Sequence, residues 1–340
     1  MPPTNPVLKI LLSSHFFSPA LGGIETVSAL LAEQFTQAGH QVIVVTTTPL
    51  PAGMPEPVAP YEVVRNPATG RFLSLLKWSD LCFQNNISLQ YPWPLAIAAR
   101  PWVVAHQTWM GSSWKDGLKR RSLRWGSNIS ISAAVAARLP VASVVIPNPY
   151  DAAVFWADPA EARTKDLVFV GRLVSDKGVD LLIQAIGLLR GQGLAPTVTI
   201  VGGGSDAALL QAQVAAAGLG GQIDFAGPMH GPALARVLNQ YRIMVIPSRW
   251  DEPFGVVALE GIACGCVTVG SSGGGLPEAM GPCGVTFPNG NAAALAGALA
   301  GLLRDPARQR ALQAHAAGHL ARHTPRLIAE GYLQVFAQAG

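Results

Sequence analysis

Short apolar runs alternate with amphipathic segments along almost the whole chain, and this alternation constrains the fold more than any other feature. Residues 23–38 illustrate the helical segments, because Val27, Leu30, Leu31 and Phe35 lie on one side at helical spacing. Strands separated by helices form parallel sheets with helices on both faces, so the pattern predicts an α/β protein. The apolar runs predict strands at residues 7–13, 41–46, 81–84, 102–105, 129–131, 144–146, 167–170, 197–201, 223–225, 243–246 and 267–270.

The alternation is interrupted once, in the proline-rich and polar stretch at residues 147–166, and then restarts. A chain of 340 residues is long enough for about two domains. We therefore expect two similar Rossmann-like α/β domains, joined near residue 155. Ligands of such sheets bind outside the carboxyl ends of the strands, so a cleft between the domains is the expected binding site.

The charge and the hydropathy of the chain argue against several other classes. A formal net charge of +4 is too small to indicate a nucleic-acid-binding protein. Met1 to Pro6 lack the charged start of a secretory signal, and no apolar run reaches the roughly 18 to 20 residues of a membrane span. The cysteines show no disulfide spacing pattern. We expect a cytoplasmic protein, with a peripheral contact to the inner face of the plasma membrane as a further option.

The segment from Asp251 to Glu260 has the strongest chemical character in the chain. It follows a strand-like run, and Gly255 allows a tight turn whose exposed N–H groups then open a helix. A helix N-terminus favours anions and hydroxyl-rich ligands. Glu252 stands at the turn, and Glu260 lies about one and a half helical turns into the helix. Two carboxylates placed in this way can hold two parts of one polyhydroxylated ligand; the simpler alternative is a capped helix with two solvated glutamates.

Two further turns offer groups that suit a phosphate. Gly22 and Gly23 follow the first strand and open the first helix, where free N–H donors can bind a phosphate. In the second domain Arg172 follows a strand and Lys177 precedes a helix, so two cations converge in a way that suits a diphosphate. For either turn alone, an ordinary loop is an equally good or better interpretation.

Two other patterns are less specific. Residues 202–207 imitate the dinucleotide fingerprint G-x-G-x-x-G/A, and Asp224 follows about 20 residues later. This run follows the second strand of its domain instead of the first, so it is weak support for a nicotinamide cofactor. His106, at the end of a predicted strand, is a candidate to hydrogen-bond a substrate, although a lone histidine is more often structural.

Two groups of residues resemble metal-ligand sets. Cys264 and Cys266 have no matching pair at zinc spacing, and are expected to be small residues of a buried strand. His315, His319 and His323 recur at positions i, i+4 and i+8, and are expected to form a partly exposed basic face of one helix. No Asp-x-Asp occurs, so the usual carboxylate pair of a Mg-dependent sugar-nucleotide enzyme is absent. We expect no metal site.

Residues 113–125 form the one strongly basic stretch of the chain. On a helix, Trp114, Leu118 and Trp125 would share a face, with basic residues flanking it. This composition suits an anionic membrane surface or a lipid-phosphate acceptor. The alternative is a domain helix whose aromatic side chains pack inward.

Taken together, these segments resemble the retaining GT-B glycosyltransferases of family 4, the glycosyl transferases group 1, over nearly the whole chain. The resemblance implies two Rossmann-like α/β domains whose parallel sheets face each other across a cleft. Residues 1–155 would form the acceptor-side domain and residues 156–320 the nucleotide-sugar-binding domain, with a helix at 321–340 returning toward the first. The motifs, which occur in the family's order, are P-x-x-G-G-I-E at 19–25, P-N-x-x-D at 147–151, G-R-L-x-x-x-K-G at 171–178 and E-P-F-G-x-x-x-x-E at 252–260.

The resemblance also implies roles in the C-terminal domain. Arg172 and Lys177 would bind the donor diphosphate. Glu260 would bind the ribose hydroxyls, and Glu252 the transferred sugar. One departure concerns the linker, which reads Pro-Asn-Pro at 147–149 where the family usually has Asn-Gly, and this puts the identity of the acceptor in doubt.

Five more residues take roles by the same resemblance. The amides around Phe254 and Gly255 would hold sugar hydroxyls and phosphate. Gly22 and Gly23 would face the diphosphate across the cleft, and His106 would lie near the sugar.

The function implied is a retaining, metal-independent transfer of a hexose from a UDP- or GDP-linked sugar to a glycan or a lipid-linked acceptor. Such a reaction serves bacterial cell-surface polysaccharide or glycolipid synthesis, and the nucleotide sugar is a co-substrate, so no cofactor is expected. Two alternatives share the architecture: a sugar-nucleotide epimerase and a catalytically silent glycan-binding homologue. Turnover of a sugar nucleotide in the presence of an acceptor separates both from a transferase.

Overall fold

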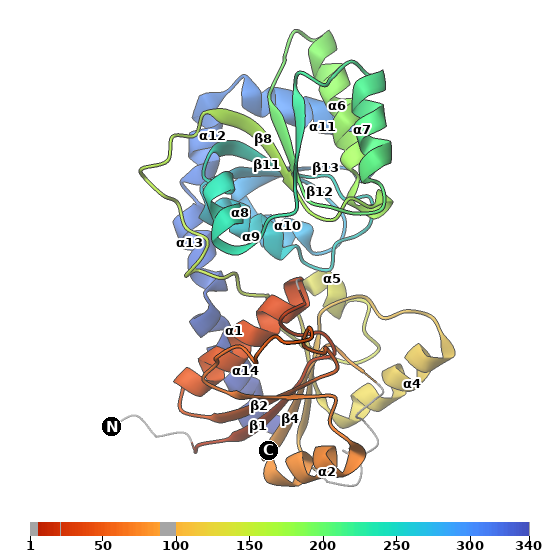
Figure 1. Ribbon diagram of the computed structural model, residues 1–340, viewed down its shortest axis with the longest axis vertical. Helices are drawn as coiled ribbons and strands as arrows, with labels where there is room; N and C mark the ends of the chain where they lie inside the picture. Colours follow the sequence, from red (N-terminus) through yellow and green to blue (C-terminus); the bar gives the residue numbers. More distant parts are fainter. Residues whose placement is uncertain (1–5, 21, 89–99, 340) are drawn as a thin grey trace. The chain divides into compact units, whose positions relative to one another are not determined.

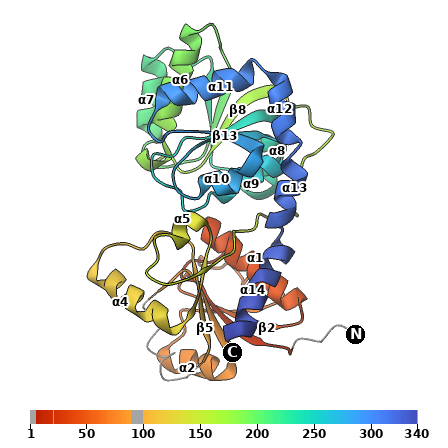
Figure 2. The ribbon, with the colours of Figure 1, turned by 180° about the vertical axis from the view of Figure 1, so that it is seen from behind.

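The computed structural model describes residues 6–20, 22–88 and 100–339, and it divides into two compact units (Figures 1 and 2). The first unit comprises Met1–Pro149 together with His323–Gly340, and the second comprises Tyr150–Arg322. The chain therefore passes from one unit to the other at residues 149–150, slightly before the expected junction near residue 155. Each unit is built around a parallel sheet, so the predicted pair of Rossmann-like α/β domains is confirmed.

The sheet of the first unit has the order β3-β2-β1-β4-β5-β6-β7 among the described residues, with every pair parallel. Its central strands are buried on both faces, as the near-continuous apolar runs predict. Its strands are β1 (Lys9–Ser13), β2 (Gln41–Thr46), β3 (Glu62–Arg65), β4 (Leu81–Asn85), β5 (Trp102–His106), β6 (Ser127–Ser130) and β7 (Val144–Val145).

Helices from both ends of the chain cover one face of this sheet. Helix α1 (Gly23–Gln37) packs against α14 (Pro325–Ala339), as Figure 2 shows. Phe35 and Phe83 meet Tyr332 and Phe336 there, with ring centroids 5.3 to 6.4 Å apart, which is typical of aromatic packing. The remaining described helices of this unit are α2 (Thr69–Trp78), which packs on the opposite face, α4 (Trp114–Ser122) and α5 (Ala133–Ala136).

The sheet of the second unit has the order β10-β9-β8-β11-β12-β13, again with every pair parallel. Numbered within the unit this is 3-2-1-4-5-6, the doubly wound order of a Rossmann fold. Its strands are β8 (Lys165–Val170), β9 (Val198–Val201), β10 (Ile223–Gly227), β11 (Tyr241–Ile246), β12 (Val267–Ser271) and β13 (Gly284–Phe287).

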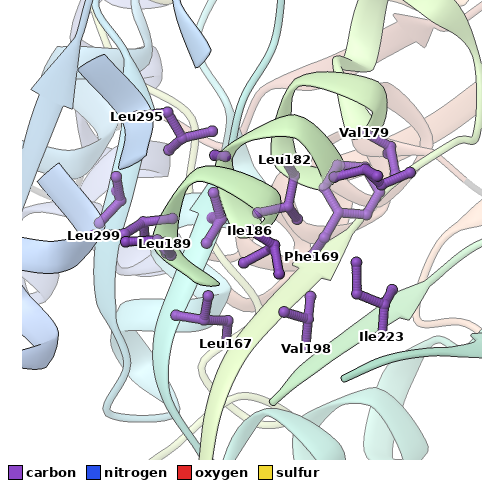
Figure 3. Packing of buried hydrophobic residues seen from close by; sticks show 14 of the residues in the cluster. Leu167, Phe169, Val179, Leu182, Ile186, Leu189, Val198, Ile223, Leu295 and Leu299 are labelled. Atoms are coloured by element: carbon purple, nitrogen blue, oxygen red, sulfur yellow. The ribbon is translucent and has the colours of Figure 1, made fainter. Parts of the chain in front are cut away.

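The main core of the second unit lies between this sheet and the helices on one of its faces. Figure 3 shows Leu182 and Ile186 of α6 lying over Leu167, Phe169 and Val198 of the strands. The opposite face is covered in part by α9, where Gly261 leaves room for the side chain of Met244. The helices of this unit are α6 (Val179–Gly191), α7 (Ala207–Ala216), α8 (Gly231–Leu238), α9 (Val256–Ala263), α10 (Leu276–Met280), α11 (Ala292–Leu303), α12 (Pro306–Gln313) and α13 (Ala316–Leu320).

Every strand predicted from the sequence is present, with small differences at its ends. Two edge strands were not predicted. β3 has only two apolar residues between charged ends, and β13 begins at a glycine directly after a short 3₁₀ turn. Edge strands are half-exposed, so they lack the long apolar run that marks a central strand.

Candidate active site

The strand order of the second unit places two loops side by side at the carboxyl edge of its sheet. β8 and β11 are neighbours, but the chain leaves β8 toward β9 and leaves β11 toward β12. Ligands of doubly wound sheets bind at this switch point. The loop at residues 171–178 follows β8 and the loop at residues 247–255 follows β11, so the structure brings the two strongest motifs of the sequence together.

Lys177 and Glu252 are in direct contact across this switch point. Lys177 Nζ lies 2.6 Å from Glu252 Oε1, and Ser248 Oγ lies 2.6 Å from the same oxygen. The two charged side chains keep only 21% and 12% of their surface exposed. Glu252 Oε2 makes no hydrogen bond among the described residues, so the two carboxylate oxygens differ: Oε1 is held by two donors and Oε2 by none.

Arg172 provides a second cation in the same loop. Its side chain is exposed and makes no hydrogen bond or ion pair within the described ranges. Next to it, the buried Leu173 fixes the loop against the core. An unpaired guanidinium in the same loop as a partly buried ammonium group is suited to an anion with several oxygens, such as a diphosphate.

Backbone contacts hold the two loops against each other. The carbonyl of Asp176 accepts hydrogen bonds from the N–H groups of Arg249 and Trp250, and the Arg249 side chain pairs with Asp180. Gly178 has a left-handed backbone, with φ at 68°, and a side chain there would clash with the carbonyl of Pro247. A glycine is therefore required both for the turn and for the close approach of the second loop.

Helix α9 begins at this site. Its N-cap is Gly255, with φ at 103°, and Phe254 just before it is buried, so the N–H groups of the first turn open next to Glu252. A third loop, at residues 272–275 after β12, completes this part of the site. Gly274 forms a parallel bridge with Glu252, and the N–H of Gly275 donates to the carbonyl of Glu252 over 2.7 Å.

The predicted motifs do not include this third loop, although three successive glycines that begin two residues after the end of β12 were a usable signal. They also do not include Ser248, which lies two residues beyond the end of β11 and four before Glu252.

Glu260 lies further along α9, on a partly buried surface. Burial, with a smaller contribution from repulsion by the Asp151 carboxylate, raises the pKa of Glu260 to about 7. Its side chain makes no hydrogen bond among the described residues. A carboxyl group with a pKa near neutrality and no internal partner is typical of a functional site.

The run at residues 202–207 has a structural explanation that does not involve a dinucleotide. Side chains at Gly202 and Gly204 would clash with the carbonyls of Gly171 and Leu173, so these glycines let the turn after β9 lie directly against the Arg172 loop. Asp224 is the second residue of β10 and so lies near the amino end of the sheet, where it cannot take the ribose role of the fingerprint acid.

The remaining predicted residues belong to the first unit. Gly22 caps α1 in an extended conformation, and the Glu25 carboxylate folds back against it, while the space around Gly23 is open. Leu21, in the same motif, lies outside the described residues. His106 ends β5 and is 0% exposed, and its Nε2 lies 3.0 Å from Asn128 Oδ1. Burial lowers the pKa of His106, so the imidazole is neutral near pH 7. Its role near a sugar stays a prediction.

A chain of buried polar side chains runs along the carboxyl edge of the first sheet, and no sequence motif predicted it. Ser28 Oγ lies 2.9 Å from Ser14 Oγ and accepts from Asn85. Gln107 donates to Asn85 over 2.8 Å, and Asn148 donates to Gln107 over 2.8 Å. The chain joins the ends of β1, β4 and β5 to the start of the linker, so it fixes the shape of this edge.

The histidine pattern does not form the expected helical face. His315 is the N-cap of α13, His319 lies within α13, and His323 lies in a separate 3₁₀ turn. His319 and His323 are buried, with ring nitrogens 2.7 Å from the carbonyl of Ala279 and 3.3 Å from that of Asn148. The expectation of one basic face is therefore wrong, because tertiary contacts override the spacing. Within the described ranges, no group of three or more His, Cys, Asp and Glu is placed to hold a metal ion.

The basic stretch forms α4 and the 3₁₀ turn that follows it, at the outer side of the first unit (Figure 1). Trp114 and Trp125 are each 73% exposed and Leu118 is 49% exposed, so the inward-packing alternative is wrong. The helix is capped by Ser113 and Asp116 in a capping box. In the described part of the chain, no helix is long and apolar enough to cross a membrane.

Residues 154–319 match the family described as "Glycosyl transferases group 1". This stretch lies within the second unit and contains the Arg172, Lys177, Glu252 and Glu260 positions. The match covers just under half of the chain, and the structural neighbours below share its fold of two parallel-sheet domains.

Curated relatives match between a third and a half of the chain. A D-inositol 3-phosphate glycosyltransferase from Jonesia denitrificans is 39% identical over 121 residues, which are 34% of this chain and 28% of that protein. A glycogen synthase from Mycobacterium tuberculosis is 37% identical over 156 residues, which are 45% of this chain and 37% of that protein. The matched segments thus span roughly a third of these relatives' length.

Solved structures match nearly the whole chain at low identity. Anabaena HepE in complex with UDP and glucose superposes with a TM-score of 0.80 at 18% identity, covering 97% of this chain and 100% of that one. A sucrose-phosphate synthase from Thermosynechococcus elongatus gives a TM-score of 0.79 at 22% identity, covering 97% and 98%. At these identities the likeness shows the fold.

Proposed function

We propose that this protein transfers a hexosyl group from a UDP- or GDP-linked sugar to a glycan or a lipid-linked acceptor, with retention of configuration. The observation that carries the proposal is the pairing of Lys177 with Glu252 at the switch point of the second unit, with the unpaired cation of Arg172 in the same loop as Lys177. The site thus offers positive charge for a diphosphate and a carboxylate oxygen for a sugar hydroxyl. The identity of up to 39% with a named glycosyltransferase adds to this support.

The chemistry asked of these residues is mainly electrostatic. When the bond between the sugar's anomeric carbon and the diphosphate oxygen breaks, negative charge develops on the leaving diphosphate. Arg172, Lys177 and the N–H groups at the start of α9 stabilise that charge from fixed positions. The acceptor oxygen bonds the anomeric carbon on the face that the diphosphate leaves, and the acceptor's proton passes to a phosphate oxygen. This route needs neither a protein nucleophile nor a metal.

Glu252 and Glu260 serve recognition in this proposal. Glu252 Oε2 accepts a hydrogen bond from a hydroxyl of the transferred sugar, and Glu260 accepts from the ribose hydroxyls. The family resemblance assigns N–H donors for the diphosphate to Gly22 and Gly23 of the first unit and a sugar contact to His106, and the proposal adopts these roles.

The proposal for the acceptor is argued from the exposed residues of α4 and the turn that follows it. We infer that the acceptor is presented at an anionic membrane surface on its cytoplasmic face, because exposed Trp114 and Trp125 stand among the exposed cations Lys115, Arg121 and Arg124. The acidic residue in this helix, Asp116, is already paired with Lys119 at 3.2 Å. Such a surface suits synthesis of a cell-surface polysaccharide or glycolipid.

The test is a thermal-shift scan with UDP-, GDP- and ADP-hexoses, followed by assays of the stabilising donor with candidate acceptors. Bound ligand raises stability with occupancy, so the true donor gives the largest rise in Tm. Transfer with retained configuration at the anomeric carbon supports the proposal. Interconversion of the free sugar nucleotide without an acceptor would identify an epimerase, and glycan binding without turnover would identify a silent homologue.

A further inference from the structure

We propose that Ser248 is a positioning residue for the transfer, which fixes one oxygen of Glu252 so that the other is presented to the donor sugar. The proposal rests on the proposed function and adds a residue that neither the motifs nor the family resemblance pointed to. Ser248 touches no reacting atom in this scheme, and acts through Glu252.

The hydrogen-bond geometry assigns the direction of this contact. An ionised carboxylate can only accept, so the Ser248 hydroxyl donates its proton to Glu252 Oε1 over 2.6 Å. Ser248 is 1% exposed, so water does not compete for that hydroxyl. An O–H donor to a carboxylate at this distance is in the short, charge-assisted class.

The two oxygens of Glu252 are therefore unequal. Oε1 accepts from both Ser248 and Lys177, whereas Oε2 has no partner within the described residues. The backbone of Glu252 is fixed separately, by the bridge to Gly274 and by the N–H of Gly275. With the backbone held, the remaining freedom is rotation of the carboxylate, and Ser248 removes it.

Because of this contact, the Glu252 carboxylate can keep its orientation when the Lys177 side chain moves. A bound diphosphate competes with Glu252 for the ammonium group of Lys177. With Ser248 present, Oε1 keeps a donor when Lys177 turns toward the phosphate. Without it, the carboxylate can follow the ammonium group and Oε2 no longer meets the sugar hydroxyl. Loss of Ser248 should thus impair use of the sugar and leave binding of the nucleoside diphosphate intact.

The experiment compares Ser248→Ala with Ser271→Ala. Ser271 ends the neighbouring strand β12 and is 0% exposed, but its hydroxyl has no partner among the described residues, so it is a matched control. For Ser248→Ala we expect kcat/KM for the nucleotide sugar to fall by roughly 10-fold to 100-fold, mainly in kcat. The Kd for UDP and for GDP, measured by calorimetry, should change by less than about twofold. Ser271→Ala should match wild type in both.

A double-mutant cycle gives the second readout. In a Glu252→Ala background the Ser248→Ala change should cost nothing further, because the two residues act as one unit. Two outcomes would overturn the proposal. One is that the losses of the two single variants add fully in the double variant, and the other is that Ser248→Ala loses UDP and GDP binding by as large a factor as it loses kcat/KM. A crystal structure of Ser248→Ala with UDP bound is independent of the reaction: a Glu252 carboxylate in a new orientation relative to wild type with UDP supports positioning, and an unmoved one refutes it. If wild type turns over no nucleotide sugar, the proposed function fails while this structural outcome still decides the role of Ser248.

Discussion

Lys177 and Glu252 form an ion pair at 2.6 Å although 75 positions of sequence separate them, and the pair joins the loops that follow β8 and β11. The motifs at residues 171–178 and 252–260, each of which is weak evidence alone, thus lie together in the structure. Under the proposed function, a donor has to compete with the Glu252 carboxylate for Lys177, whereas the Arg172 side chain has no internal partner among the described residues. The contributions of these residues can be measured separately.

Removing either cation should weaken donor use. We expect Arg172→Ala and Lys177→Ala each to lower kcat/KM for the nucleotide sugar by roughly 100-fold or more, because charge-assisted contacts to a developing diphosphate charge are strong. Arg236→Ala is the control, since it removes an exposed cation from α8 in the same unit. Wild-type kinetics in either of the first two variants would remove that residue from the diphosphate site.

Activity should persist in EDTA. Under the proposed function, Arg172 and Lys177 supply the positive charge that a divalent ion supplies in a metal-dependent enzyme. The measurement is initial rate with and without EDTA, with Mg²⁺ or Mn²⁺ added back. Complete loss that either ion restores would show this expectation to be wrong.

Donor affinity should depend on pH through Glu260. Burial, with the Asp151 charge adding to it, raises the pKa of this carboxyl group to about 7, so much of it is protonated near neutrality in the free protein. The ionised form is the better acceptor for ribose hydroxyls, so affinity should rise by roughly tenfold from about pH 6 to about pH 8.

Calorimetric Kd values for UDP across this range measure the pH effect. Glu260→Gln is the control that cannot ionise, and its affinity should be flat over the same range. A flat profile in wild type, or the same slope in the glutamine variant, would separate Glu260 from the ribose.

Helix α4 should bind anionic membranes. Electrostatic attraction is worth about 1 kcal/mol per basic residue near an anionic surface, and exposed tryptophans add apolar contact. Flotation with anionic liposomes should recover wild type at low salt and lose it as salt rises, because the attraction is screened. Changing Trp114 and Trp125 to Ser, or Lys115, Arg121 and Arg124 to Ser, should abolish flotation.

Trp156→Ser serves as the matched control for the aromatic variant, since Trp156 is 52% exposed but lies in the second unit. It should float like wild type. If wild type does not bind anionic liposomes at low salt, a soluble acceptor becomes the better interpretation.

Tyr332→Phe should stabilise the protein. The Tyr332 ring packs with Phe35 and Phe83, but its hydroxyl is buried without a hydrogen-bond partner in the described residues. Removing an unsatisfied hydroxyl should raise the free energy of unfolding of the first unit by about 1 kcal/mol. Phe336→Leu in the same cluster should lower it, and urea unfolding followed by tryptophan fluorescence compares the two. A destabilised Tyr332→Phe would mean that the hydroxyl has a partner.

The sequence predicted the fold more completely than it predicted the site. Central strands such as β8 and β11 are buried on both faces, so their composition alone identifies them. The site depends on interactions between segments distant in the chain, such as the charge repulsion between Asp151 and Glu260 and the ion pair between Lys177 and Glu252. Periodicity carries no information on such contacts, and for the histidines near the C-terminal end of the second unit it gave the wrong arrangement.

The position of α14 at the end of the sequence predicts the order in which the two units fold during synthesis. The aromatic cluster of the first unit needs Tyr332 and Phe336, which the ribosome adds only after the entire second unit has been made. The second unit is continuous in sequence, so it can complete its core while the first still lacks a helix. The part of the protein synthesised first should therefore be the last to reach its native state, and nascent chains halted before α14 should expose Phe35 and Phe83 to chaperones and proteases.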